Sequence, residues 1–328
     1  MNSKDHIAHL LENAHGEFIS GEEIAQKLGV TRTAVWKAIN TLKSEGYPIS
    51  AVTNRGYRLD REIDWLDGTE IEKLLLPNLG FIRVESCKST PSTNTAVKER
   101  AENGEGEGFV LCASEQTAGK GRMGRAFFSP VDTGLYMSLL LRPVFPAQLS
   151  SMITAAAAVA VCRAIEEITG KKAGIKWVND IFIDGKKVCG ILTEASFSLE
   201  SGGFDYAILG IGINVYSPAG GFPPEIAGVA GAILDEAETG LKNRLCASVI
   251  NGFYGFYENL ANRAFLPEYR IRSTVIGKRV SVMTLSGEVK ESAFAVGIDD
   301  NCNLILRGDD GSERAVSSGE IRIRPEMR

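Results

Sequence analysis

A seven-residue stretch, Gly-Lys-Gly-Arg-Met-Gly-Arg at positions 119–125, brings three glycines and three cationic side chains together. Glycine lets the backbone approach a ligand closely and adopt positive φ. Lys120, Arg122 and Arg125 add charged hydrogen-bond donors at the same place. This combination predicts a loop that binds a polyanion.

The glycines also follow the G-x-G-x-x-G order of a dinucleotide-binding turn. Such a turn opens a helix, whereas Pro130 and Gly134 interrupt the residues that follow this loop. The acidic residue expected about 20 positions later is also missing, because no Asp or Glu lies between Asp132 and Glu166. The loop therefore needs an explanation other than a dinucleotide-binding turn.

Further polar clusters share the middle of the chain with this loop, and Gln116 lies just before it. They are Ser92-Thr93-Asn94, the block Lys176-Trp177-Val178-Asn179-Asp180 with Lys186 and Lys187 after it, and a Gly-Ile-Gly-Ile segment that ends at Asn214. On composition alone, a solvated hairpin explains the lysines better than a binding site does, since lysines are usually exposed. The clusters become informative only in combination.

The composition limits the kind of protein. The chain has 328 residues, 44% hydrophobic and 23% charged, and a net charge of -5, which indicates a globular protein of two or three domains. The longest apolar run, residues 153–162, is too short to span a bilayer, and the N-terminus has no apolar signal segment. We therefore expect a soluble cytoplasmic protein with no membrane partner.

The positions of the cysteines and histidines limit which metal sites and which catalytic residues the protein can have. The six cysteines are scattered singly, without zinc or disulfide spacing. His6, His9 and His15 all lie near the N-terminus, where a solvated helix face is a better interpretation than a metal site. We predict no metal-ligating residues, and catalysis by Lys, Arg, Asp or substrate positioning rather than by histidine.

The first 60 residues have the pattern of helix, turn, helix and hairpin. An apolar face predicts a helix over residues 6–14, and Ser20 starts a second helix as a capping residue. A third helix covers Arg32–Ser44, and Ile49–Val52 with Gly56–Leu59 form a hairpin. This arrangement resembles a winged helix-turn-helix DNA-binding domain.

Basic charge in this unit gathers on the third helix and the hairpin. Between Thr31 and Leu59 the single acid, Glu45, stands against Arg32, Lys37, Lys43, Arg55 and Arg58. A basic helix and wing suit phosphate and major-groove contact. The residues we expect to contact DNA are Thr31, Arg32, Thr33, Trp36, Lys37, Asn40 and Arg55. The alternative is a winged helix used only for packing or protein contact.

After a linker, strands and helices follow in mixed order. Thr69 is the expected cap of a short helix, longer helices are predicted at 92–102, 147–169 and 241–261, and a loop is predicted at 217–231. From Gly277 onward, short strands between Ser-Gly and Asp-Gly turns predict a small SH3-like β-barrel. The predicted fold class is α+β multidomain, with a mixed-sheet middle domain and domain limits of 1–60, 69–272 and 273–328.

In this order, between a winged helix and a C-terminal barrel, the clusters resemble those of the biotin-protein ligases, and specifically of the bifunctional bacterial form that also represses biotin genes. The resemblance covers essentially the whole chain, and its specific parts are the glycine-arginine loop and the block at 176–180. It implies that biotin attacks the α-phosphate of ATP to give biotinyl-5'-AMP and pyrophosphate. The acyl group then passes to a lysine of a biotin carboxyl carrier protein or domain.

The resemblance also implies partners and site residues. Magnesium is expected because it usually accompanies ATP, and a ligand-linked homodimer is expected to bind operator DNA. Lys187 would hold the reacting carboxylate and phosphate, Arg122 would close over the adenylate, and Asp180 and Lys176 would assist. The implied biotin-binding residues are Ser92, Thr93, Asn94, Gln116, Lys120, Gly121, Arg122 and Lys187. The implied residues for ATP or adenylate are Gly119, Gly124, Arg125, Phe127, Asn179, Asn214 and Arg324.

Four positions depart from the family's usual pattern. Lys120 and Met123 stand in a loop that is commonly richer in arginine, Phe127 replaces a tryptophan that stacks on adenine, and Val178 stands where proline is usual. Other functions are also compatible with the sequence: a lipoate ligase, whose catalytic fold is related, a repressor that senses a small molecule without catalysis, or a ligase with an idle winged helix.

Overall fold

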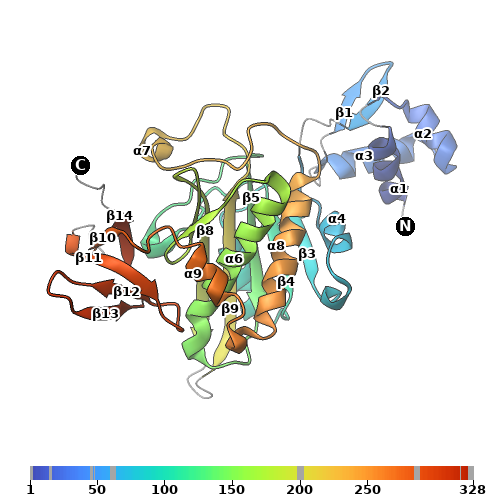
Figure 1. The fold of residues 1–328 in the computed structure, drawn as a ribbon. Helices are drawn as coiled ribbons and strands as arrows, with labels where there is room; N and C mark the ends of the chain where they lie inside the picture. Colours follow the sequence, from blue (N-terminus) through green and yellow to red (C-terminus); the bar gives the residue numbers. More distant parts are fainter. Residues whose placement is uncertain are drawn as a thin grey trace.

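A seven-stranded sheet forms the middle of the molecule, and two smaller units flank it on opposite sides (Figure 1). The structure is a computed structural model that describes residues 3–14, 17–44, 47, 49–59, 64–197, 203–283, 289–317 and 319–323. The N-terminal unit contains the first three helices and a hairpin, and the C-terminal unit contains the last five strands. Within the described residues, no helix has both the length and the apolar character needed to cross a membrane.

The N-terminal unit is a helix-turn-helix with a wing, as predicted. Its elements are α1 (Ser3–Asn13), α2 (Gly21–Leu28), α3 (Arg32–Ser44), β1 (Ile49–Val52) and β2 (Gly56–Leu59). Ser20 Oγ accepts from the Glu23 N–H and Thr31 Oγ1 from the Ala34 N–H, both at 3.1 Å, so α2 and α3 begin where the capping signals predict. The unit has its own hydrophobic core, separate from the main one, which includes Ile7, Leu11, Ile24, Val35, Ile39 and Leu42.

The central sheet is mixed. Its strands are β3 (Arg83–Cys87), β4 (Phe109–Ala113), β5 (Gly134–Leu141), β6 (Gly174–Lys176), β7 (Asp180–Ile183), β8 (Lys186–Phe197) and β9 (Phe204–Asn214). They lie in the order β3-β4-β5-β9-β8-β7-β6, with β3 and β4 parallel and the other neighbours antiparallel. This order places β5, β9 and β8 side by side at the centre, and it confirms the α+β prediction.

Different helices cover the two faces of this sheet. α6 (Ser150–Thr169) and α8 (Leu241–Tyr257) pack on one face (Figure 1), where Leu139 and Leu141 join the main core. α5 (Thr93–Glu102) packs on the other face, where Leu140 and Ile208 contribute to a smaller core. Successive strand residues point to opposite faces, so Ser138, two residues before Leu140, lies on the α5 side. The candidate site opens on this side.

Some local boundaries differ from the sequence prediction. α4 (Gly68–Lys73) is capped by Asp67 rather than Thr69, because the Asp67 carboxylate accepts from the N–H groups of Thr69 at 2.9 Å and Glu70 at 3.2 Å. The predicted loop at 217–231 contains the short helix α7 (Pro224–Ala227). The helix predicted at 241–261 ends at Tyr257. These differences leave the predicted order of the longer elements unchanged.

The C-terminal unit is an antiparallel sheet that packs directly on the central domain. Its strands are β10 (Arg279–Met283), β11 (Val289–Ile298), β12 (Leu304–Arg307), β13 (Glu313–Val316) and β14 (Glu320–Ile323), in the order β13-β12-β11-β10-β14. Val280, Ala295 and Ile321 belong to the same buried cluster as the central strands. The Trp177 indole N–H also donates to the Cys302 carbonyl at 2.9 Å. The two units therefore share one hydrophobic core.

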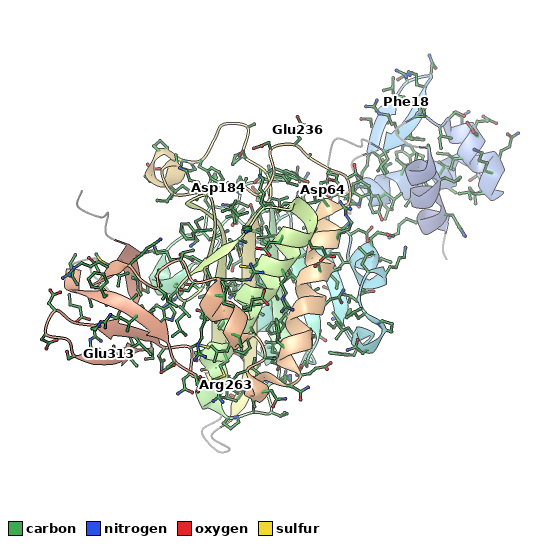
Figure 2. All side chains as sticks on the ribbon, viewed as in Figure 1. Phe18, Asp64, Asp184, Glu236, Arg263 and Glu313 are labelled. Atoms are coloured by element: carbon green, nitrogen blue, oxygen red, sulfur yellow. The ribbon has the colours of Figure 1, made fainter. Side chains whose placement is uncertain are left out.

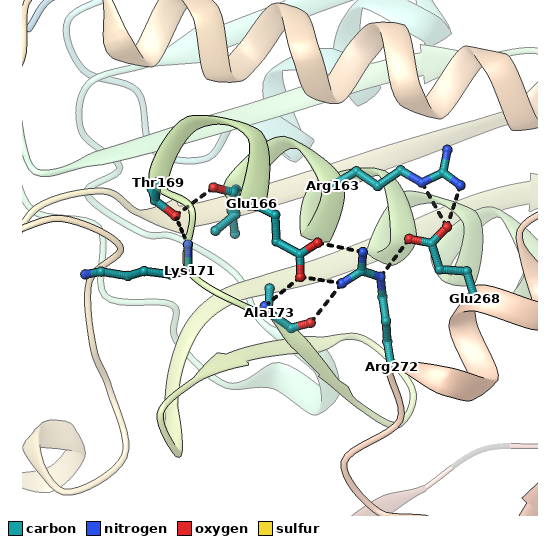
Figure 3. Close-up of polar contacts among 8 residues, drawn as sticks. Arg163, Glu166, Thr169, Lys171, Ala173, Glu268 and Arg272 are labelled. Carbon is teal, nitrogen blue, oxygen red and sulfur yellow. Dashed lines mark hydrogen bonds and ion pairs between the residues drawn. The ribbon is translucent and has the colours of Figure 1, made fainter.

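Arg272, a mostly buried residue at the end of α9 (Leu266–Ile271), forms an ion pair with Glu166 of α6 (Figure 3). The Arg272 guanidinium donates to both carboxylate oxygens of Glu166 at 2.7 and 2.8 Å, to Glu268 at 2.8 Å and to the Ala173 carbonyl at 3.1 Å. These hydrogen bonds hold the pKa of Glu166 below its ordinary value of 4.5. Because the C-terminal unit begins shortly after Arg272, this joint helps to fix its position.

Replacing Glu166 with Gln tests this joint through the pH dependence of stability. A carboxylate whose pKa is lowered by folding stabilises the protein above its unfolded-state pKa, and this contribution disappears as the pH falls through the folded-state pKa. We expect Glu166→Gln to reduce the free energy of unfolding by about 1–2 kcal/mol near neutral pH. The deficit should shrink below about pH 4.5.

Urea unfolding of both proteins across this pH range measures the difference. The exposed Glu236, replaced by Gln, is the control and should change stability little. A deficit of the same size at neutral and acidic pH would show that the charge of Glu166 is not what stabilises the joint.

A buried lysine connects α8 to two other segments. Lys242 has no solvent exposure, and its Nζ donates to the carbonyls of Asp64 at 2.9 Å and Asp132 at 2.7 Å. Burial lowers the pKa of Lys242 and raises that of Asp64, while the two charges oppose these shifts. Asp64 lies near the junction with the winged helix (Figure 2), where Tyr47 donates to the Asp67 carboxylate. This network holds the start of the central domain in place.

Candidate functional site

A cavity opens on the α5 face of the central sheet, between the glycine-arginine loop, the β7–β8 hairpin and the C-terminal unit. Side chains and backbone from several distant segments line it. The lining residues are Ser92, Thr93, Asn94, Gln116, Lys120, Gly121, Arg122, Met123, Arg125, Ala126, Phe127, Lys176, Trp177, Asn179, Asp180, Lys187, Gly190, Ile191, Leu192, Gly210, Ile211, Gly212, Gly319 and Ile321. Most of the residues that the sequence suggested for a ligand site meet here.

The glycine-arginine loop folds as a tight hairpin over this cavity. The Gly121 N–H donates to the Arg125 carbonyl at 2.7 Å, which closes the hairpin. At its tip, a 3-10 turn (Arg122–Gly124) has Met123 at φ 58° and Gly124 at φ 73°. Glycine adopts this left-handed conformation without the steric cost that other residues meet. The glycines therefore allow a tight turn that presents cations toward the cavity.

Arg122 connects the loop to two other parts of the site. Its Nη1 donates to Asn179 Oδ1 at 3.0 Å, and its Nη2 donates to the Gly319 carbonyl at 3.3 Å. Asn179 is itself held by β8, since its Nδ2 donates to the Ile191 carbonyl at 2.7 Å. The loop, the 176–180 block and the C-terminal unit therefore meet at one guanidinium group.

Two facing glycines form the floor of the cavity. Gly190 of β8 and Gly212 of β9 are direct partners across the sheet. A Cβ atom on Gly212 would come within 2.5 Å of the Phe127 ring, and one on Gly190 within 3.1 Å. Phe127 also makes an edge contact with Tyr136, with ring centroids 6.4 Å apart. A flat ring thus lies directly on bare backbone at this point.

Lys187 and Asp180 form an ion pair at the edge of the cavity. Lys187 Nζ lies 2.6 Å from Asp180 Oδ1, and the two side chains are 33% and 23% exposed. The neighbouring Lys186 turns away, because its Nζ donates to the carbonyls of Ala227 at 3.2 Å and Gly228 at 2.8 Å. Strand alternation separates the two lysines, and of the pair Lys187 is the one that lines the cavity.

A hydrogen-bonded set of polar side chains forms the inner wall. The N–H and hydroxyl of Thr93 both donate to Gln116 Oε1, at 2.9 and 3.1 Å. Ser138 Oγ lies 2.7 Å from Thr93 Oγ1 and donates to Asn94 Oδ1 at 2.6 Å. Asn94 Nδ2 donates to Glu194 at 2.7 Å. A ligand that enters the cavity therefore meets polar groups that are already oriented.

The lining is strongly cationic. The basic side chains are Lys120, Arg122, Arg125, Lys176 and Lys187, and among the described lining residues the opposing carboxylate is Asp180. Lys120 Nζ donates to Thr95 Oγ1 at 2.8 Å, and Lys176 Nζ lies 5.7 Å from the centre of the Phe182 ring. An excess of one sign of charge in a cleft attracts ligands of the opposite sign. The site can therefore hold an anion of high charge.

Three of the predicted ligand-binding residues do not line the cavity. The Asn214 amide donates to the Gly231 carbonyl at 3.0 Å. Gly119 and Gly124 shape the loop, and a Cβ atom on Gly119 would come within 2.5 Å of the Phe127 carbonyl. Arg324 lies outside the residues that the structure describes.

Several lining residues were missed by the sequence prediction. Gly210 and Gly212 lie in the segment that the sequence singled out, but only Asn214 of that segment was given a ligand role, and Gly190 was not singled out. All three had a usable signal, because glycine inside a strand often marks close approach of a ligand or another backbone. Gly319 and Ile321 had no comparable signal. Their place in the lining depends on how the C-terminal unit packs on the central domain.

A second recess lies on the N-terminal unit, between α3 and the wing. All seven residues predicted to contact DNA are exposed, and the Trp36 side chain is 56% exposed although it is large and apolar. Arg32 forms an ion pair with Glu22 at 3.2 Å, and the Arg55 guanidinium lies 4.2 Å from the centre of the Phe18 ring. Residues from α2, α3 and the wing line the recess. This surface is free to meet an external partner.

Comparison with known proteins covers all three units. The biotin/lipoate A/B protein ligase family model matches residues 86–214, an HTH domain model matches 4–58, and a biotin protein ligase C terminal domain model matches 275–324. The bifunctional ligase/repressor BirA of Bacillus subtilis is 36% identical over 316 residues, which is 95% of this chain and 96% of that protein. The biotin–[acetyl-CoA-carboxylase] ligase of Mycobacterium tuberculosis is 30% identical over 260 residues, 76% of this chain and 92% of that protein.

A solved structure of a biotin protein ligase is also similar to most of this chain. The biotin protein ligase from Aquifex aeolicus in complex with biotin and ATP superposes with a TM-score of 0.60 at 28% identity, and covers 74% of this chain and 98% of that one. The chain therefore belongs to the biotin/lipoate A/B protein ligase family. Within that family it has the three-part organisation of the bifunctional ligase/repressors, because its match to the Bacillus subtilis protein includes the helix-turn-helix.

Proposed function

We propose that the protein activates biotin with ATP as biotinyl-5'-AMP, transfers the biotinyl group to a lysine of a biotin carboxyl carrier domain, and represses biotin genes by binding operator DNA. The observation that carries the enzymatic part is the convergence of a polar wall, a cationic loop and Lys187 on one cavity. We also propose domain limits of 1–60 for DNA binding, 69–272 for catalysis and 273–328 for the C-terminal domain.

The chemistry needs two anions to approach each other. A carboxylate oxygen of biotin attacks the α-phosphorus of ATP, and the bond to the departing pyrophosphate breaks. Lys187 can donate to both reacting groups, so it would hold them together and offset their repulsion. Arg122 would close over the product, Lys176 and Arg125 would contact phosphates, and Phe127 would stack on the adenine. In the second step the acceptor amine attacks the acyl carbon and AMP leaves.

The remaining assignments follow the position of each residue in the cavity. We assign biotin to the polar wall and the start of the loop, namely Ser92, Thr93, Asn94, Gln116, Lys120 and Gly121. Asn179 would contact the adenylate through the same amide that now holds Arg122. Asn214, whose amide now donates to the Gly231 carbonyl, would turn to reach the ribose or a phosphate. Arg324 would contact ATP from the C-terminal domain.

Magnesium would enter the site on the phosphates of ATP. Among the described residues, no group of three or more His, Cys, Asp or Glu is placed to hold a metal. Asp180 is the carboxylate in the cavity, and Mg²⁺ is commonly held by one or two carboxylates together with substrate phosphates. Asp180 would exchange its ion pair with Lys187 for the metal, or accept a proton from the acceptor amine in the second step.

Incubation with biotin, MgATP and a biotin carrier domain tests the ligase. We expect pyrophosphate release that depends on biotin, followed by labelling of one carrier lysine. Lipoate should compete poorly with biotin. Absence of labelling at micromolar biotin, or preference for lipoate, would reject this function.

The repressor part rests on the exposed α3 surface and on the family organisation. We propose that adenylate-bound protomers form a homodimer in the cytoplasm and that each contributes one winged helix to the operator. Sedimentation with and without biotinyl-5'-AMP measures the dimer. A gel shift with the promoter of the biotin genes, with and without biotin and ATP, measures DNA binding.

Lys37→Ala should weaken operator binding without affecting ligation. Lys37 is exposed on α3 beside the recess, so we assign it to a phosphate contact. Loss of one such contact should reduce the slope of log affinity against log salt by about one. Lys73→Ala, on α4 of the central domain, is the matched control and should leave the slope unchanged. If the unsubstituted protein, Lys37→Ala and Lys73→Ala all give the same slope, Lys37 does not contact a DNA phosphate.

A further inference from the structure

Three consecutive residues, Trp177, Val178 and Asn179, form the turn between β6 and β7, and the first and last of them line the cavity. Each residue of this turn is anchored to a different element. The Trp177 indole donates to a carbonyl of the C-terminal unit, and the Asn179 amide donates to a carbonyl of β8. The Val178 carbonyl accepts from the hydroxyl of Tyr269, on α9, at 2.9 Å. Tyr269 lies outside the lining, so its contact with the site runs through this turn.

Tyr269 is a rigid support for the turn. Its side chain is fully buried in the main core, and its hydroxyl has a single hydrogen, which is directed to the Val178 carbonyl. α9 is attached to α6 through the Arg272–Glu166 pair (Figure 3), and the Ile175 N–H of β6 donates to the Arg272 carbonyl at 2.8 Å. The ring of Tyr269 therefore cannot follow the turn if the turn moves.

The bonds between Asn179 and β8 leave one movement of the turn open. The Ile191 N–H donates to the Asn179 carbonyl at 3.1 Å, and Asn179 Nδ2 donates to the Ile191 carbonyl at 2.7 Å. Because both bonds go to one residue, the turn can still tilt about that residue. The Tyr269 bond acts on the peptide group between Val178 and Asn179, and it comes from a different element. It therefore opposes this tilt.

The tilt of the turn matters because Asn179 holds Arg122. Asn179 Oδ1 accepts from Arg122 Nη1 at 3.0 Å, which keeps the glycine-arginine loop over the cavity. Without the hydroxyl of Tyr269, the Val178 carbonyl would lose its donor, and a backbone acceptor without a partner is costly inside a protein. The turn would then move toward the solvent in the cavity and carry Asn179 Oδ1 away from the guanidinium.

Asp180, the next residue, is held against this movement by the sheet. It pairs with Lys176 on β6 and with Gly190 on β8. Its ion pair with Lys187 therefore does not depend on Tyr269. Loss of the tyrosine hydroxyl should disturb the closed loop more than the reacting groups.

We propose that Tyr269 is a positioning residue for loop closure, which fixes the 177–179 turn so that Asn179 holds Arg122 over the bound adenylate. This inference rests on the proposed function, in which Arg122 closes over biotinyl-5'-AMP. α9, which lies outside the cavity, thereby helps to retain the intermediate between the two steps of the reaction.

Tyr269→Phe removes the hydroxyl and keeps the ring in the core. We expect release of biotinyl-5'-AMP to become about tenfold faster, while its synthesis at saturating biotin and ATP changes by less than about threefold. Rapid gel filtration after a pulse of labelled biotin measures release, and pyrophosphate production in the first turnover measures synthesis.

Tyr254→Phe is the matched control. Tyr254 is also buried, on α8, but among the described residues its hydroxyl has no hydrogen-bond partner. Its replacement removes the same atom without removing a bond to the site. The half-life of the bound adenylate should stay within about twofold of that of the unsubstituted protein.

A double-mutant cycle with Arg122→Met separates this role from a general loss of stability. If Tyr269 acts through Asn179 and Arg122, adding Tyr269→Phe to Arg122→Met should speed release by less than about a further twofold. A purely structural role would give the same tenfold factor in both backgrounds and would reduce synthesis and retention together. That result would overturn the proposal.

Normal retention of the adenylate by Tyr269→Phe would also overturn it, and would leave the ligase function standing. If the unsubstituted protein forms no biotinyl-adenylate from biotin and MgATP, the proposed function fails, and the role of Tyr269 fails with it. Synthesis by the unsubstituted protein separates the two failures, because it is measured before any substitution is compared.

Discussion

Lys187→Ala is expected to reduce biotinyl-adenylate synthesis by at least about a thousandfold. The substitution removes the cation that would hold the biotin carboxylate and the α-phosphate together. It also leaves Asp180, now 2.6 Å from Lys187 Nζ, as an unpaired carboxylate that faces two incoming anions. Repulsion by Asp180 therefore adds to the loss of attraction. Pyrophosphate release at saturating biotin and ATP measures this effect.

Lys186→Ala is the matched control for this experiment. Lys186 is the adjacent residue and has the same charge, but its Nζ donates to carbonyls at the end of α7 and does not reach the cavity. Its loss should change the rate by less than about tenfold. If both variants lose activity equally, net charge around the hairpin matters more than the position of Lys187. If Lys187→Ala keeps near-normal synthesis, its assignment is wrong.

Arg122→Gly is expected to separate synthesis of the adenylate from its retention. Arg122 now joins the loop to Asn179 and to the C-terminal unit through Gly319. Without these charge-assisted bonds, and with a fourth glycine in the loop, closure costs more conformational entropy. We expect release of biotinyl-5'-AMP to become about 10- to 100-fold faster while its synthesis continues. Free adenylate should then biotinylate exposed lysines on unrelated proteins.

Arg122→Met distinguishes the guanidinium from the backbone effect of glycine. Methionine keeps the backbone restricted but cannot make either hydrogen bond, so it should release adenylate nearly as fast as Arg122→Gly. A pulse of labelled biotin followed by rapid gel filtration gives the half-life of the bound adenylate. Normal retention in both variants would refute the assignment of Arg122 to closure, whereas normal retention in Arg122→Met alone would locate the effect in the backbone.

The order of elements could be predicted from the sequence because its signals are local. Ser20 and Thr31 cap α2 and α3 within three residues of their own positions. The start of α4 was missed because Asp67 and Thr69 are both good capping residues, and the choice between them depends on the chain's approach to α8, where the Asp67 N–H donates to Asn243. Local capping rules cannot rank two suitable residues when a distant contact decides.

The residues that line the cavity could be suggested from the sequence where they belong to the short motifs that carry the family resemblance. Lys187 and Asp180 form a pair through one hairpin, and Thr93 and Asn94 sit at the start of one helix. The contact between Arg122 and Gly319 was not predictable, because it joins segments from two units. The same applies to Asn214, whose partner Gly231 arrives through a long connection. Non-local packing therefore limits what spacing alone can reveal.

The separation of the two hydrophobic cores has a consequence for how such a chain can evolve. The winged helix closes its own core, so a gene can gain or lose this module without exposing the interior of the rest. The C-terminal unit has no such independence, because Val280, Ala295 and Ile321 complete the interior of the catalytic domain. The DNA-binding unit can therefore be lost while the catalytic domain stays folded, whereas the C-terminal sheet cannot be lost without exposing the core of that domain.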